Sequence, residues 1–85
     1  RYPQTCVNVK VFSKPALESL KKVNEAIESV ERILGNTGRI LVRYSGTENI
    51  CRVMVEGTKQ KQVIQLAQEV ATAVREEIGV EIDKK

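Results

Sequence analysis

The sequence predicts a two-layer α+β fold, in which two helices cover one face of a small, mainly antiparallel sheet. Three observations predict it. Short stretches alternate between apolar and polar residues, as half-buried strands do. Two longer stretches repeat apolar residues every three or four positions, as helices with one buried face do. A turn-forming stretch joins two of the expected strands, so the order is strand, helix, strand, strand, helix, with a possible short last strand.

The first strand is expected over residues 5–12, where valine alternates with polar residues. A helix follows, and either Ser13 or Ser19 is expected to cap it, a choice that the sequence leaves open. Its buried face comprises Leu20, Val23, Ile27, Val30 and Leu34. Gly35 is typical of the residue that ends a helix.

Two further strands are expected over residues 39–44 and 50–56, with the turn Ser45–Asn49 between them. Because this turn is short and contains Gly46, the strands should form an antiparallel hairpin. In the first strand Ile40, Val42 and Tyr44 share one face, and Arg39, Leu41 and Arg43 share the other. In the second strand Cys51, Val53 and Val55 face opposite to Arg52, Met54 and Glu56.

The last helix is expected from Lys59 to about Ile78, opened by Gly57 and Thr58. Its buried stripe comprises Val63, Leu66, Ala67, Val70, Ala73 and Val74. A short edge strand is possible over residues 80–82, and the final residues 83–85 should fray.

Length and composition indicate a single domain over residues 1–85 with a mild net charge of +3. The absence of a long apolar run and of a signal-peptide pattern argues against a membrane protein and favours the cytoplasm. Cys6 and Cys51 are expected to be reduced and partly buried, although a disulfide between neighbouring strands stays open. With no histidine, a metal site built on nitrogen and sulfur is not expected. The first residue is Arg1, which suggests a piece of a larger protein.

Residues 43–48 and Arg52 concentrate the polar chemistry of the chain in one turn. Arginine offers a bidentate, charge-matched contact to phosphate, and hydroxyls and backbone N–H groups donate to its oxygens. Successive N–H groups in such a turn can form an anion-binding nest, and glycine permits positive φ and close approach. The candidate phosphate-binding residues are Arg43, Ser45, Gly46, Thr47 and Arg52. Glu48 and Asn49 are expected to support them, Glu48 by pairing with an arginine or with the turn backbone.

The motif Arg-Tyr-Ser-Gly-Thr-Glu at residues 43–48, followed by Arg-Val-Met-Val-Glu-Gly at 52–57, resembles the C-terminal domain signature of the α-D-phosphohexomutase superfamily. The continuation after Arg52 resembles the bacterial phosphoglucosamine mutase branch. The stretch at residues 2–11 is similar to the entry into the fourth domain of those enzymes. Many relatives carry proline where this chain has Asn49, so its turn should be less stiff.

The resemblance implies a domain of a four-domain isomerase that interconverts glucosamine 6-phosphate and glucosamine 1-phosphate through a phosphoserine and a bisphosphorylated sugar. This domain would hold the phosphate that is not reacting, through the five candidate residues. Mg²⁺ and a hexosamine bisphosphate activator are implied for the whole enzyme, and neither is expected to bind in this domain. The implied partners are the phosphosugar and the N-terminal domains of the same chain.

Three alternatives accompany this interpretation. Another phosphohexomutase, acting on mannose or glucose phosphates, is one. A purely structural domain, which closes a cleft or mediates dimer contacts, is another. A small KH-like or RRM-like nucleic-acid-binding module is the third, because residues 35–38 match a GxxG loop. That loop precedes an expected strand rather than joining two helices, and three aromatic residues are too few for a stacking platform, so no nucleic-acid partner is expected.

Overall fold

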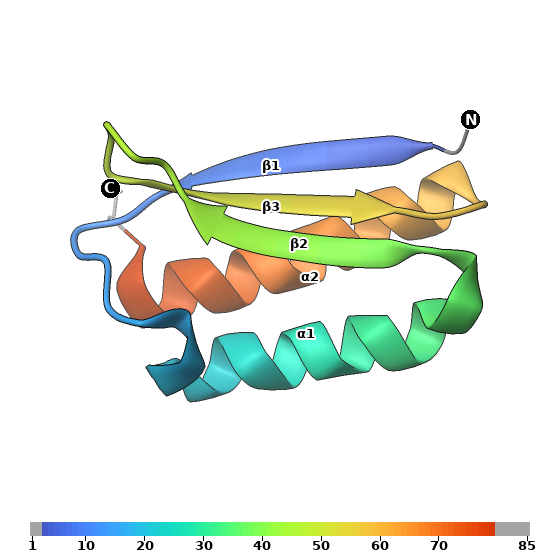
Figure 1. Cartoon of the computed structure of the whole chain (residues 1–85), viewed down its shortest axis with the longest axis horizontal. Coiled ribbons are helices and arrows are strands. Elements are labelled where there is room, and N and C mark those ends of the chain that lie inside the picture. Colours follow the sequence, from blue (N-terminus) through green and yellow to red (C-terminus); the bar gives the residue numbers. More distant parts are fainter. Residues whose placement is uncertain (1–2, 80–85) are drawn as a thin grey trace, which may run out of the picture.

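Three antiparallel strands form one sheet in the order β1-β3-β2 in the computed structural model, which describes residues 3–79 (Figure 1). The strands are β1 (Gln4–Lys10), β2 (Arg39–Tyr44) and β3 (Ile50–Glu56). The last of the three in the chain therefore lies in the centre and pairs with both of the others. The expected α+β class, the hairpin and the mainly antiparallel sheet are all confirmed.

Both long helices, α1 (Lys21–Leu34) and α2 (Gln60–Ile78), pack on the same face of the sheet (Figure 1). Alternation along β3 directs Cys51, Val53 and Val55 toward them, and all three are fully buried. The core is one continuous cluster of apolar side chains from all three strands and both helices, and no polar side chain of residues 3–79 is buried. A single complete core is what an independently folding unit needs.

The start of α1 differs from both expected caps. The residue that precedes its first turn is Leu20, whose side chain offers no cap, and the Lys22 N–H in that turn donates instead to the Glu77 carboxylate of α2 at 2.6 Å. Ser19 instead belongs to a 3-10 turn, η1 (Leu17–Ser19), and its hydroxyl donates to the Ala16 carbonyl at 2.7 Å. The Asn24 amide donates to the carbonyls of Leu17, Glu18 and Leu20, each at 3.0 Å. The local bonds of Asn24 and the tertiary bond to Glu77 thus order the entry that a serine cap was expected to fix.

The first strand is shorter than expected, since it ends at Lys10 rather than at residue 12. Val11 is buried and forms an isolated bridge with Gly79, while Phe12 is 67% exposed. Alternation continues past the last ladder pair, so the pattern alone could not place the end. The possible strand at residues 80–82 and the frayed end at 83–85 lie outside the described residues.

Two glycines shape the connection from α1 to β2, which contains a second 3-10 turn, η2 (Gly35–Thr37). Gly35 ends α1 as expected, with φ of 54°, a conformation that favours glycine. Gly38 lies against the backbone at the other end of β3, where a Cβ would collide with the Glu56 carbonyl oxygen. The GxxG sequence therefore joins a helix to a strand and packs on the sheet, unlike a loop between two helices.

The two cysteines lie on opposite faces of the sheet. Cys51 points into the core, whereas Cys6 is exposed on the face without helices. Both are free, and their register partners differ, Met54 for Cys6 and Val9 for Cys51. The expectation of two partly buried thiols holds for neither, and a disulfide between these two residues is excluded by their opposite directions.

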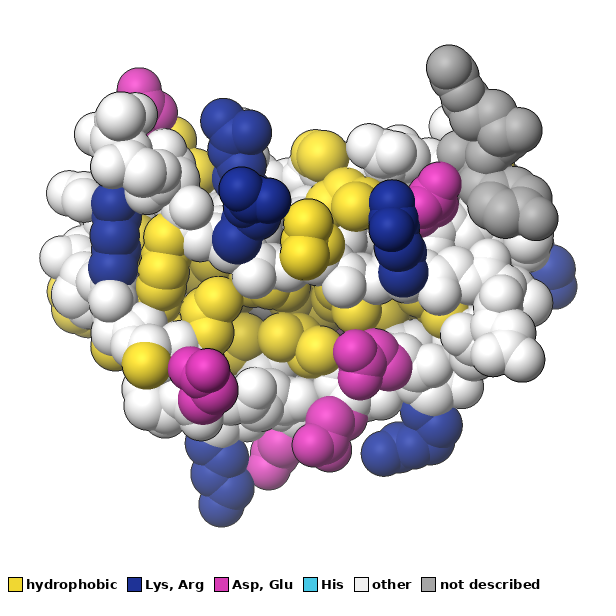
Figure 2. Space-filling view, in the orientation of Figure 1, with side chains coloured by type: hydrophobic (Ala, Val, Ile, Leu, Met, Phe, Trp, Pro, Cys, Tyr) yellow, Lys and Arg dark blue, Asp and Glu magenta, His cyan; other side chains and the backbone are white. Residues whose placement is uncertain are grey.

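Both layers carry charged side chains. Basic side chains stand along the sheet, acidic and basic side chains lie together over α1, and apolar side chains are visible between the two layers (Figure 2). Within residues 3–79, no helix is both long and apolar enough to span a membrane.

Candidate functional site

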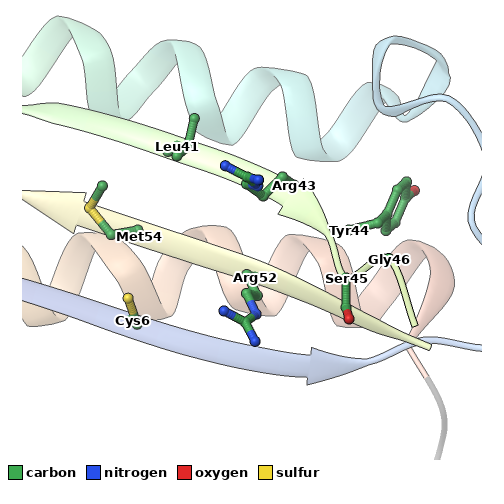
Figure 3. A pocket seen from close by; sticks show the side chains of 8 residues that line it. All are labelled: Cys6, Leu41, Arg43, Tyr44, Ser45, Gly46, Arg52 and Met54. Atoms are coloured by element: carbon green, nitrogen blue, oxygen red, sulfur yellow. The ribbon is translucent and has the colours of Figure 1, made fainter. Parts of the chain in front are cut away.

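Arg43 and Arg52 stand directly opposite each other on β2 and β3, in the register that pairs the two strands. Both side chains are exposed on the face of the sheet that no helix covers (Figure 3). The strands position them rigidly, because the alternate residues Tyr44 and Cys51 are held on the covered face. The register therefore places the two arginines side by side, while in Figure 3 the Arg43 side chain extends along β2 toward Leu41 and the Arg52 side chain extends toward β1.

Like charges directly opposite each other on neighbouring strands are destabilising. Two ion pairs occur among residues 3–79, Lys22 with Glu76 and Arg39 with Glu56, and neither involves the opposed arginines. Of the two roles expected for Glu48, the ion pair with one of these arginines is not formed, and its bond within the turn is made by its backbone N–H to the Ser45 hydroxyl. An anion bound between Arg43 and Arg52 would relieve their repulsion, and a dianion would match both charges.

The turn that follows β2 is organised by the Ser45 hydroxyl. The Ser45 N–H donates to the Ile50 carbonyl at 2.8 Å and closes the hairpin. The Ser45 Oγ accepts from the N–H groups of Thr47 and Glu48, each at 3.3 Å. Because its acceptor positions are used within the turn, its own O–H remains to donate to another group.

This geometry corrects two expectations about the turn. The N–H groups of Thr47 and Glu48 point back to Ser45, so they do not form an outward-facing nest. Gly46 does not adopt positive φ, and a Cβ there would meet nothing within 4 Å. The backbone therefore does not require glycine at this position, and the absent side chain leaves the approach to the turn open.

A pocket of about 440 Å³ lies over the arginine pair and the start of the turn (Figure 3). Its lining brings together four of the five candidate residues, Arg43, Ser45, Gly46 and Arg52, and leaves out the exposed Thr47. The other lining residues are Cys6, Leu41, Tyr44 and Met54. The sequence gives no sign that the apolar lining residues contribute to a site. Strand alternation does predict that Leu41 shares a face with Arg43 and that Met54 shares a face with Arg52.

Tyr44 connects the turn to a distant segment. Its hydroxyl donates to the Pro15 carbonyl at 2.6 Å, and its ring points away from the arginine pair (Figure 3). Burial, and to a lesser degree the neighbouring Cys51, raises the pKa of the Tyr44 hydroxyl above its usual value. Burial alone raises the pKa of the Cys51 thiol. The Tyr44 hydroxyl thus keeps its proton and its hydrogen bond at neutral pH.

Asn49, the position expected to carry proline, binds through its backbone. Its carbonyl accepts from the Val11 N–H at 2.9 Å, which attaches the end of the turn to the residue that follows β1. Glu48 and Asn49 are both exposed and lie outside the pocket lining. Both residues contact the rest of the structure through backbone groups, the Glu48 N–H and the Asn49 carbonyl.

The family profile for the C-terminal domain of phosphoglucomutase and phosphomannomutase matches residues 7–73, a span that includes the second half of β1, all of α1, the hairpin and most of α2. The chain belongs to this family. As a phosphohexomutase C-terminal domain, it has close relatives among curated proteins. Phosphoglucosamine mutase of Protochlamydia amoebophila is 66% identical over 82 residues, and that of Chlamydia trachomatis serovar D is 55% identical over 82 residues.

Each of these two alignments covers 96% of the chain and 18% of the relative. The more distant phosphoglucosamine mutase of Syntrophus aciditrophicus is 46% identical over 92% of the chain and 17% of the relative. The phosphohexomutase domain therefore spans less than a fifth of the length of these proteins. The resemblance to the glucosamine branch is confirmed by all three.

Solved structures give the same assignment. Aspergillus fumigatus N-acetylphosphoglucosamine mutase in complex with GlcNAc-6P and magnesium matches with a TM-score of 0.72 and 30% identity over 93% of this chain and 16% of that one. A variant of the same enzyme in complex with glucose 1,6-bisphosphate matches with a TM-score of 0.76 and 32% identity over the same shares. The phosphohexomutase domain thus has solved relatives with the same fold.

Proposed function

We propose that this phosphohexomutase domain holds a phosphate group of a phosphosugar within a phosphoglucosamine mutase. The whole protein would interconvert glucosamine 6-phosphate and glucosamine 1-phosphate through a phosphoserine and a bisphosphorylated intermediate. The opposed pair Arg43 and Arg52 is the observation that carries the proposal. A phosphate monoester is largely a dianion at neutral pH, so it balances two guanidinium groups that have no carboxylate partner among residues 3–79.

The turn completes the grip in this proposal. The Ser45 hydroxyl, already an acceptor for two N–H groups, donates its proton to a phosphate oxygen. Gly46 leaves the approach open, because no side chain projects from it. Thr47, the fifth candidate, lies outside the pocket lining and contributes through its N–H bond to Ser45.

The pocket composition suits the phosphate that is not reacting. Its lining contains no carboxylate, so it offers no charged partner to the amine of glucosamine phosphate. Recognition by charge and hydroxyl donation does not depend on which sugar carbon carries the phosphate. Such indifference is what a mutase needs, because the intermediate must turn end for end between its two half-reactions.

Magnesium and the bisphosphate activator belong to the whole enzyme in this proposal. Within residues 3–79, no three side chains of His, Cys, Asp or Glu come together as a metal-binding group. Magnesium is usually held by one or two carboxylates together with substrate phosphates, and no carboxylate lines the pocket, so we assign this domain no step in phosphoryl transfer. The N-terminal domains of the same chain are the proposed partners that supply the chemistry.

Affinity in the isolated domain should be weak. Charge-assisted hydrogen bonds contribute on the order of 1.5–3 kcal/mol each, and association itself costs about 4 kcal/mol or more. Exposure to solvent screens the arginines further. We expect a dissociation constant near or above roughly 1 mM for a sugar phosphate, and no mutase activity without the other domains.

The test compares two arginines of the same strand and face in the whole enzyme. Arg43→Ala should raise the apparent KM for glucosamine 6-phosphate and for the bisphosphate by about tenfold or more, since it removes a charge-assisted contact. Arg39→Ala is the matched control, because Arg39 pairs with Glu56 at 3.0 Å and lies outside the pocket. Steady-state kinetics on both substrates measures the difference.

An unchanged KM for both substrates in Arg43→Ala would contradict phosphate binding by this domain and would indicate a structural role instead. Equal losses in Arg39→Ala and Arg43→Ala would indicate a general effect of surface charge instead. Turnover of glucosamine 6-phosphate by the isolated domain would contradict the division of labour.

A further inference from the structure

We propose that Lys14, which lies outside the pocket lining, adds a third positive charge next to the phosphate site and is positioned by its bond to the turn. This inference rests on the proposed function. Lys14 is distant from the turn in sequence, and it belongs to the connection between β1 and α1 that the phosphate motif does not include. Its ammonium group donates to the Ser45 carbonyl at 2.9 Å, on the same residue whose hydroxyl organises the turn.

The connection around Lys14 holds the turn at three points. Lys14 binds the Ser45 carbonyl, and the neighbouring Pro15 carbonyl accepts from the Tyr44 hydroxyl at 2.6 Å. Val11 donates to the Asn49 carbonyl at 2.9 Å. Both the entry and the exit of the turn are therefore attached to one short segment, which follows a strand of the same sheet.

Charge gives Lys14 a second effect beyond this attachment. It makes no ion pair with any acidic side chain in the described range 3–79. An ammonium group has three donors, and one of them is used on Ser45. The remaining positive charge lies beside the turn that carries Ser45 and Gly46, so it adds to the field of Arg43 and Arg52. An anion at the turn would be attracted by all three.

Lys14 also restrains the turn. The backbone positions of the two arginines are fixed by the ladder, but within the turn the hydrogen bonds are those of the Ser45 N–H and the Ser45 hydroxyl. A lysine bound to the Ser45 carbonyl restrains the peptide that carries this hydroxyl. Lys14 is thus a positioning residue that also contributes charge.

The experiment titrates inorganic phosphate into the ¹⁵N-labelled chain and follows the amide shifts of residues 43–52. Four proteins are compared: wild type, Lys14→Met, Lys14→Arg and the control Lys61→Met. Lys61 is an equally exposed lysine at the start of α2, at the opposite end of the molecule from the turn (Figure 1). Lys14→Met should weaken phosphate binding about threefold to fivefold, the range for an exposed charge contact.

The other two variants and a salt series distinguish the effect of the Lys14 charge from other effects of the substitution. Lys14→Arg should bind within about twofold of wild type, because it keeps both a donor and the charge. Lys61→Met should match wild type. The difference between wild type and Lys14→Met should shrink as sodium chloride is raised, since salt screens exposed charges.

Two results would overturn the assignment of Lys14 alone: equal phosphate affinity in wild type and Lys14→Met, or a loss in Lys14→Arg as large as that in Lys14→Met. Absence of any phosphate-dependent shift in the wild-type chain up to tens of millimolar would instead contradict the proposed function. A shift of wild type that is spread evenly over the surface, rather than confined to the turn, would do the same.

Discussion

The two faces of the sheet use the same three strands for different purposes. On the covered face Val53, Val55 and Cys51 of β3 are fully buried under the helices. On the open face, one residue along, β3 presents Arg52 and Met54 to a shallow pocket. Alternation thus separates the residues that stabilise the fold from those available for binding, and neighbouring positions in the sequence should respond oppositely to substitution.

The largest effect should come from a matched pair of leucines. Leu34 is 2% exposed in the core, and Leu41 is 46% exposed on the open face. We expect Leu34→Ala to lower the free energy of unfolding by about 2–5 kcal/mol, because it removes buried methyl groups and leaves a cavity. Leu41→Ala should change it by less than about 0.5 kcal/mol. Urea denaturation followed by circular dichroism measures both.

Comparable losses of unfolding free energy in Leu34→Ala and Leu41→Ala would contradict the difference between the two faces. They would require the open face to be covered in solution. A Leu34→Ala chain that is already unfolded without denaturant agrees with the expectation, because a small domain has little stability to lose.

Two glycines sharpen the same contrast at opposite ends of the hairpin. Gly38→Ala should destabilise the chain by about 1–3 kcal/mol, since the new Cβ collides with the backbone at Glu56. Gly46→Ala should leave thermal unfolding almost unchanged, because its Cβ meets nothing within 4 Å and its φ is not positive. Any effect of Gly46→Ala should appear in phosphate affinity. A large loss of stability in Gly46→Ala would mean that the turn needs glycine for its own conformation.

The smallest effect concerns the two thiols and pH. Burial raises the pKa of Cys51 in the folded chain above the value of about 8.5 for an unfolded one. Between these two pKa values the folded chain keeps a proton that the unfolded chain has released. The free energy of unfolding should therefore fall as pH rises through about 8.5, with a slope of at most about 1.4 kcal/mol per pH unit.

The matched measurement compares Cys51→Ala with Cys6→Ala. Cys51→Ala should flatten this alkaline dependence, and Cys6→Ala is the control for loss of an exposed thiol. In the native chain a thiol reagent should modify Cys6 rapidly and Cys51 only after unfolding. Rapid modification of both thiols under native conditions would show that the covered face opens readily.

Sequence patterns were sufficient for most of the fold, because they report which side chains are buried. The hairpin and both helical stripes follow from periodicities of 2 and 3.6. The start of α1 could not be found in this way, since bonds from Asn24 and a tertiary contact with Glu77 replace the serine cap. The end of β1 was misplaced because Val11 is buried outside the ladder.

The sequence was sufficient to predict which residues form the candidate site, but only part of their arrangement in space. The motif placed Arg43 and Arg52 near each other, and the register places them directly opposite. The internal bonds of Ser45 were not predictable, because several turn conformations fit five polar residues. Lys14 carries no local signal at all, since its contact depends on how the connection after β1 folds back over the turn.

The central position of β3 has a consequence for the order in which the structure assembles. β2 and β3 meet across one short turn, so their hairpin can close as soon as residue 56 is available. Within residues 3–79, β3 is the one strand that pairs with β1, and Gln4 pairs with Glu56, so this ladder is complete only once residue 56 is present. Closing that long loop is slower than closing a hairpin. We therefore expect the arginine pair to be assembled early in folding, before the core beneath it is complete.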